Sequence, residues 1–172
     1  MNERSFTVRN LKAKIMRSWR KVSIQTCYYS SQYATRAMTN DELINKAASL
    51  IKAKKVGAFT VADVGCALIT DQDNVYFGVC IDTSSGMGFC AEHNAIGSMI
   101  TAGEFNIKSI VGVWKNENEE VFILAPCGRC REFMYQTNKQ NLDADVILGR
   151  DKVVKLKELL PYCDWFQKYR AS

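Results

Sequence analysis

Three cysteines and one glutamate stand at spacings that suit chemistry at a metal ion. Cys90 lies two residues before Glu92, and Cys127 and Cys130 follow later as a Pro-Cys-x-x-Cys pair. Three thiolates fill three corners of a tetrahedral Zn²⁺ and leave the fourth corner for water, as in catalytic zinc sites. A glutamate beside that open position can take a proton from the bound water and deliver it to a substrate nitrogen. The pattern predicts a hydrolytic zinc site.

Two other interpretations use the same residues. A Cys-x-x-Cys pair alone could be a redox pair or half of a structural zinc site. A redox pair needs no third cysteine followed by Ala-Glu. A closed zinc site would need a fourth ligand, and the single histidine of the chain, His93, directly follows Glu92. Catalytic zinc is the favoured interpretation, and structural zinc with His93 as fourth ligand is the alternative.

Length and composition restrict the class of protein. The 172 residues fit one domain with a sizeable core. No apolar run approaches the roughly 20 residues that span a bilayer, so no membrane partner is expected. Seven cysteines without a secretory signal indicate a reducing compartment such as the cytoplasm. The cysteines outside the proposed ligand set are expected to be thiols: Cys27, Cys66, Cys80 and Cys163.

The positive net charge of +5 is concentrated at the N-terminus. Residues 1–37 contain eight Lys or Arg and one acidic residue, whereas the remainder has fifteen basic and seventeen acidic residues. The body is therefore slightly acidic, which argues against a nucleic-acid partner. We expect residues 1–37 to be a basic extension outside the core. The segment is either an organellar transit peptide or sequence upstream of a true start at Met38.

The hydrophobic pattern of the body alternates between helical and extended periods. It predicts that both cysteine clusters lie at helix N-termini, where unpaired N–H groups and the helix dipole stabilise thiolate. Cations such as Arg131 or protonated His93 would offset the negative charge of three thiolates. The expected helices are 40–54, 90–102, 126–138 and 155–160, and the expected strands are 64–70, 75–81, 109–114, 121–125 and 145–148.

The segments 89–96 and 125–132 resemble the cytidine deaminase family. The similarity is greatest to its small homotetrameric branch, which includes cytidine deaminases and blasticidin-S deaminases. The resemblance extends from Met38 to the end of the chain, so residues 38–172 form the expected zinc domain. It implies an α/β fold, a three-layer α/β/α sandwich around a five-stranded mixed sheet. It also implies a homotetramer in which an aromatic residue near the C-terminus, Trp165 or Phe166, enters a neighbouring active site. A simple core or interface contact is the alternative for these two aromatics.

The reaction implied by this resemblance is hydrolytic deamination of a cytosine ring at C4, as in pyrimidine salvage. Cys90, Cys127 and Cys130 would bind one Zn²⁺ per subunit. Glu92 would deprotonate the bound water, protonate N3 of the pyrimidine and pass a proton to the departing amine. The backbone at Ala91 would contact the base.

The segment that should bind the sugar departs from the family pattern. Cytidine deaminases carry Asn-x-Glu there, and this chain has Cys80-Ile81-Asp82. Asp82 can still accept a hydrogen bond from a sugar hydroxyl, whereas Cys80 is a poor replacement for Asn. Cytidine or deoxycytidine is the expected small-molecule substrate. A modified cytosine nucleoside such as blasticidin S is the alternative, and a non-catalytic zinc-binding relative is a third possibility that Glu92 argues against.

Overall fold

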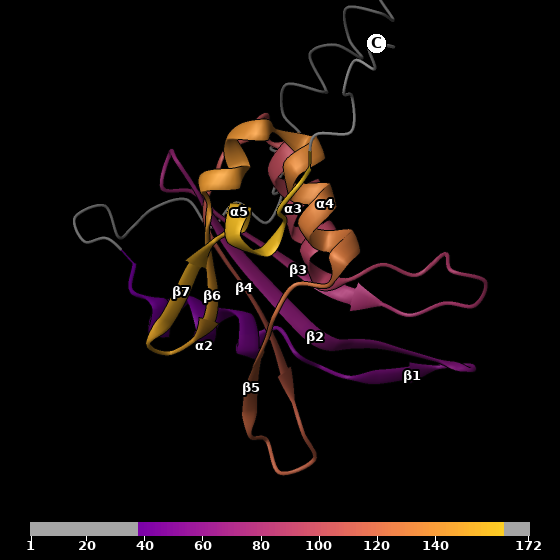
Figure 1. The fold of residues 1–172 in the computed structure, drawn as a ribbon. Coiled ribbons are helices and arrows are strands. Elements are labelled where there is room, and N and C mark those ends of the chain that lie inside the picture. The colour runs from indigo at the N-terminus through magenta and orange to yellow at the C-terminus, as the bar shows by residue number, and fades with distance from the viewer. Residues whose placement is uncertain (1–37, 164–172) are drawn as a thin grey trace, which may run out of the picture. The chain divides into compact units, whose positions relative to one another are not determined.

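The computed structural model describes residues 38–163 (Figure 1). The predictions for residues 1–37 and for Trp165 and Phe166 concern residues outside this range. No helix within the described range has the length and apolar character needed to cross a membrane. The elements in chain order are α2 (Asn40–Ser49), β1 (Lys54–Val56), β2 (Phe59–Thr70), β3 (Val75–Ile81), α3 (Ala91–Thr101), β4 (Ile107–Lys115), β5 (Val121–Leu124), α4 (Gly128–Thr137), a 3₁₀ helix (Lys139–Asp143), β6 (Asp145–Gly149), β7 (Lys152–Lys155) and α5 (Leu156–Leu159).

The strands within residues 38–163 all belong to one mixed sheet. Its path runs β1-β2-β4-β6-β7, with β3 paired to β2 and β5 paired to β4. The β4–β6 pair is parallel and the other pairs are antiparallel. The five predicted strands form the core of this sheet, which confirms the predicted mixed α/β architecture.

Helices cover both faces of the sheet (Figure 1). On β2, Cys66 and Leu68 pack into the core that contains α3, whereas Ala67 and Ile69 pack into the core formed with α2. Successive side chains of a strand point to opposite faces, so a strand covered on both sides is apolar throughout. The two cores therefore lie on opposite sides of β2 and complete the three layers.

The largest differences from the predicted elements lie at sheet edges. Helix α2 ends at Ser49 rather than near residue 54, because Lys54–Val56 form the short strand β1. A turn through Gly57, whose φ is +62°, joins β1 to β2. The side chains of β1 are all exposed. An exposed strand of three residues has no buried face, and hydrophobic alternation cannot reveal it.

A glycine on β3 allows α3 to lie directly against the sheet. A Cβ atom on Gly78 would lie 2.3 Å from the Ala91 carbonyl oxygen and 2.3 Å from the Ala95 amide nitrogen. Both are backbone atoms of α3, the helix that starts directly after Cys90 and carries Glu92. The close approach of β3 and α3 at Gly78 thus helps set the position of the predicted site.

We expect Gly78→Ala to lower the free energy of unfolding by roughly 1–3 kcal/mol, because the added methyl group must push α3 away from β3. Gly97→Ala on α3 is the matched control. A Cβ atom there meets nothing within 4 Å, and removing a helix-interior glycine should stabilise by roughly 0.5–1 kcal/mol. Urea unfolding of both variants tests the pair. Equal stability of Gly78→Ala and wild type would contradict this account of the packing.

Candidate active site

The two cysteine clusters meet at the N-termini of two helices. Cys90 is the N-cap residue of α3, and Cys127 is the N-cap residue of α4 and accepts a hydrogen bond from the Cys130 amide. The Cys127 Sγ atom lies 3.7 Å from Cys90 Sγ and 3.4 Å from Cys130 Sγ. The Sγ atoms of Cys90 and Cys130 lie within 4.8 Å of each other. Thiolates about 2.3 Å from a tetrahedral zinc stand roughly 3.8 Å apart, so the three sulfurs fit this ion.

His93 lies beside the same cluster. Its Nδ1 atom is 3.5 Å from Cys130 Sγ, and its ring stacks on Phe133 with a centroid separation of 4.5 Å. The ligand atoms of Cys90, His93 and Cys130 all lie within 4.8 Å of one another. The structure therefore brings together two overlapping sets of metal donors, which share Cys90 and Cys130 and differ in Cys127 or His93.

The thiols of the cluster differ in acidity. Burial acts to raise the pKa of Cys127, but a hydrogen bond from the Cys130 amide and interactions with the Cys130 and Cys90 sulfurs lower it below its ordinary value. Burial raises the pKa of Cys90 and of Cys130. Metal binding releases protons from thiol ligands, so binding here would be favoured as pH rises. Cys127 is therefore the thiol of this cluster most ready to ionise. The expected lowering of pKa at both helix N-termini does not hold for Cys90, which is also an N-cap residue but accepts no cap hydrogen bond.

Glu92 lies in the first turn of α3 and is buried, with 6% of its surface exposed. Its carboxyl group faces β4 at Gly112, where an added Cβ would lie 3.6 Å from Oε1. Burial raises the pKa of this carboxyl group. A carboxyl group whose pKa moves toward neutrality can both accept and return a proton, as a general acid–base must. Glu92 thus has the setting that its predicted role requires.

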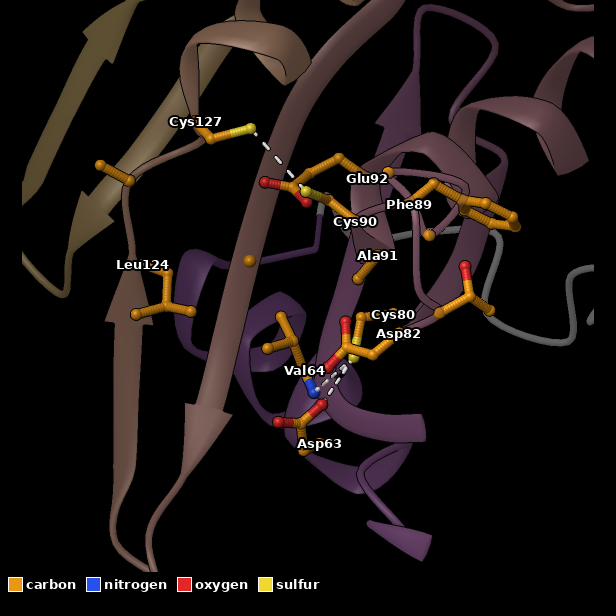
Figure 2. A pocket seen from close by; sticks show the side chains of 15 residues that line it. Asp63, Val64, Cys80, Asp82, Phe89, Cys90, Ala91, Glu92, Leu124 and Cys127 are labelled. Carbon is orange, nitrogen blue, oxygen red and sulfur yellow. Dashed lines mark hydrogen bonds between the residues drawn. The ribbon is translucent and has the colours of Figure 1, made fainter. Parts of the chain in front are cut away.

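These residues line a cavity of about 410 Å³ (Figure 2). It lies among β2, β3, the following loop and the N-termini of α3 and α4. A cavity of this size suits a small-molecule ligand. Six of the predicted site residues line the cavity: Cys80, Asp82, Cys90, Ala91, Glu92 and Cys127. Cys130 is not among the lining residues, and its Sγ lies 3.4 Å from that of Cys127.

The loop between β3 and α3 is held at both ends. The backbone N–H groups of Ile81 and Phe89 donate to each other's carbonyls at 3.0 Å, and Arg129 donates to the Gly88 carbonyl at 3.1 Å. These contacts bring the chain back to Cys90 after it leaves the sheet. Asp82 lies within this closed loop and its side chain is exposed.

The sulfur of Cys80 has two protein partners. Its thiol donates to Asp63 Oδ1 at 2.7 Å and accepts from the Val64 amide at 3.3 Å. Burial, and next the hydrogen bond to Asp63, raise the pKa of Cys80 to about 11, so the group stays a thiol at neutral pH. Asp63 also lines the cavity and was not predicted. The one available signal was an acidic residue directly before the apolar run 64–70.

The Arg131 side chain donates hydrogen bonds to two backbone carbonyl groups. Its Nε donates to the Pro126 carbonyl at 2.7 Å, and its NH1 donates to the Leu159 carbonyl at 3.1 Å. This arginine thus ties the segment before Cys127 to the C-terminal end of α5. These contacts give Arg131 a structural role. Its predicted role in offsetting the negative charge of the thiolates stays a prediction.

Comparison with known proteins places the chain in a family. The model of the family described as the cytidine and deoxycytidylate deaminase zinc-binding region matches residues 38–143. The cytidine deaminase of Mycoplasma genitalium is 33% identical over 105 residues, which cover 58% of this chain and 78% of that protein.

Two crystal structures share the fold. Cytidine deaminase from Burkholderia pseudomallei matches with a TM-score of 0.58 and 28% identity, over 73% of this chain and 98% of that chain. The Mycobacterium leprae cytidine deaminase matches with a TM-score of 0.57 and 24% identity, over 70% and 96% respectively. Together with the cysteine cluster and the buried glutamate, these similarities show that the chain belongs to the cytidine and deoxycytidylate deaminase family of zinc-binding proteins.

Proposed function

We propose that this protein catalyses the zinc-dependent hydrolytic deamination of cytidine or deoxycytidine to uridine or deoxyuridine and ammonia, a reaction of pyrimidine salvage. One observation carries the proposal. A buried glutamate and a cluster of cysteine sulfurs meet at one end of a cavity of about 410 Å³. The relatives named cytidine deaminase support the same substrate class.

The proposed ligands of one Zn²⁺ per chain are Cys90, Cys127 and Cys130. Their sulfur separations support this set. Cys127 also lines the cavity, so a metal held there would face the substrate. Zinc in a three-ligand site acts as a Lewis acid that makes water a nucleophile near neutral pH.

Glu92 is the proposed proton carrier. Its carboxylate would accept one proton of the attacking water and donate it to N3 of the cytosine ring. It would then accept the second proton from the hydroxyl group newly bonded to C4 and pass it to the leaving amine. Its burial keeps bulk water away and raises its pKa, which supports the donating steps. Ala91 is fully buried and lines the cavity, which supports the proposed contact of its backbone with the base.

The chemistry of the ring sets the direction of the substrate. C4 and N1 lie opposite each other across a pyrimidine ring, so a sugar on N1 points away from the group that attacks C4. With C4 at Glu92 and Cys90, the sugar extends toward Asp82 and Cys80, on the far side of the cavity in Figure 2. We propose that Asp82 accepts a hydrogen bond from a sugar hydroxyl.

A second candidate is deamination of a modified cytosine nucleoside such as blasticidin S. The observation in its favour is the charge of the cavity. Among the described residues that line it, three are acidic and none is Lys or Arg. An N1 substituent that carries a positive charge would be attracted by this lining.

The test is an ultraviolet assay of zinc-loaded protein with cytidine, deoxycytidine and blasticidin S in parallel. Loss of the cytosine absorbance with cytidine or deoxycytidine supports the salvage activity. Turnover of blasticidin S alone favours the second candidate. Failure to deaminate any of the three by fully zinc-loaded protein would reject the proposed substrate class.

We also infer a homotetramer in a reducing compartment such as the cytoplasm. Exposed apolar side chains on the β4–β5 hairpin support association: Trp114, Val121, Phe122 and Leu124. Thiol ligands must stay reduced to bind metal, which supports the compartment. Light scattering coupled to gel filtration should give a mass of about four chains, and a monomer at micromolar concentration would contradict the assembly.

A further inference from the structure

A bulge in β2 changes the direction of the chain beside the cavity. Val61 pairs with Ile81 and Gly65 pairs with Val79, so β2 advances four residues while β3 advances two. Ala62 within this irregular stretch has a φ of 59°, in the left-handed region that residues with a Cβ seldom adopt. Bulges redirect side chains, and they are frequent next to active sites. Asp63 follows Ala62 directly, and its side chain lines the cavity.

The side chain of Cys80 occupies this bulge from the neighbouring strand. Its sulfur accepts from the Val64 amide, a donor inside the bulge, and its thiol proton is directed to Asp63 Oδ1. Cys80 is 5% exposed and lies in the core cluster of α3. Because one buried sulfur bonds to two residues of the bulge, Asp63 and Val64, the Asp63 carboxylate is fixed in one orientation at the cavity wall.

In the substrate orientation proposed above, Asp63 lies on the side of the cavity toward which the N1 substituent of a cytosine points. Figure 2 shows Asp63, Cys80 and Asp82 on one side of the cavity and Cys127 and Glu92 on the other. A carboxylate can accept several hydrogen bonds, and Cys80 uses a single acceptor site on Oδ1. The remaining acceptor sites suit a group with hydroxyl or ammonium donors, and they repel a phosphate.

We propose that Asp63 is a substrate-binding residue that determines specificity, and that its carboxylate accepts hydrogen bonds from the N1 substituent of the cytosine. Cys80 is then a positioning residue that acts through Asp63. This inference rests on the proposed deaminase function. Under this proposal two acidic residues, Asp63 and Asp82, bind the N1 substituent. Asp63 belongs to β2, a strand that the sequence pattern did not connect with binding.

The test compares Asp63→Ala with wild type on cytidine, 2′,3′-dideoxycytidine and 5′-deoxycytidine. Hydrogen bonds to charged groups are worth about 1.5–3 kcal/mol, so kcat/KM for cytidine should fall roughly 10- to 100-fold, mainly through KM. The loss should shrink to about threefold or less for the analogue that lacks the contacted hydroxyl. Asp151→Asn, an exposed acid outside the cavity, is the matched control and should behave as wild type.

Cys80 variants separate positioning from simple packing. Cys80→Ser keeps a donor at this place and should keep KM for cytidine within a fewfold of wild type. Cys80→Ala removes the donor and should raise KM while zinc content and kcat stay close to wild type. If both variants change KM equally, the hydrogen bond to Asp63 does not position the substrate contact.

The outcomes distinguish this proposal from the function on which it rests. Suppose that wild type is active and that kcat/KM in Asp63→Ala falls by the same factor on all three substrates, or does not fall. Either result would overturn the role of Asp63 and leave the deaminase function standing. Turnover of blasticidin S only, with a comparable loss in Asp63→Ala, would support Asp63 with a cationic donor as its partner. No turnover of any cytosine compound by zinc-loaded wild type would overturn both.

Discussion

Glu92→Gln is expected to lower kcat for cytidine roughly 10²- to 10⁴-fold while zinc remains bound, because the amide has the shape of the carboxyl group but cannot carry a proton. Glu92 is buried beside Cys90 and lines the cavity, so the change removes the proton carrier without opening space. Steady-state kinetics and zinc analysis of the same preparation measure the two effects.

Glu104→Gln is the matched control for this variant. Glu104 is also 6% exposed, but its Oε1 accepts from Asn74 and Tyr76 and it does not line the cavity. It should keep kcat within a fewfold of wild type even if it unfolds at a lower temperature. Full activity in zinc-loaded Glu92→Gln would exclude Glu92 as the general acid–base.

Cys127→Ala is expected to lose zinc, and with it the activity, because two cysteines alone hold the metal much more weakly than three. The same variant distinguishes the two possible sets of metal ligands, which differ in Cys127 or His93. If Cys90, Cys127 and Cys130 are the ligands, His93→Asn should retain about one zinc per chain and Cys127→Ala should not. Zinc analysis after dialysis against a weak chelator provides the measurement.

Alkylation of wild type gives an independent check on the same question. Cys127 is exposed and its pKa is lowered, so among the cysteines of residues 38–163 iodoacetamide should modify it first in the metal-free protein. Zinc should protect it completely if it is a ligand. Zinc retention by Cys127→Ala together with zinc loss by His93→Asn would instead establish the Cys90, His93 and Cys130 set.

Much of the architecture could be predicted because its signals are local. Strand β3 has the predicted bounds, Val75–Ile81, since turn residues flank an apolar run on both sides. Thr39 caps α2 through a capping box with Glu42, as its position before the helix indicates. Both cysteine clusters lie at helix N-termini because the spacing of the ligands and the start of each amphipathic pattern coincide.

Cys80 and Asp82 were predicted and line the cavity, whereas Asp63 could not be predicted, for a physical reason. The position of Asp63 depends on a bulge whose left-handed residue, Ala62, is not a glycine, and on a contact with Cys80, which is seventeen residues away. Sequence patterns within one strand carry no information on such a contact. Cys80 therefore looked like a weak substitute for a sugar-binding residue, whereas the structure shows it bonded to Asp63.

The central claim, that the cysteine cluster and Glu92 deaminate a cytosine nucleoside with one metal ion, is tested most directly by zinc titration. Protein stripped with a chelator is supplied with increasing Zn²⁺, and cytidine deamination is followed by the loss of ultraviolet absorbance. We predict that activity starts near zero and rises in proportion to bound zinc up to about one ion per chain. Activity that does not depend on zinc, or fully zinc-loaded protein that leaves every cytosine nucleoside intact, would contradict the account.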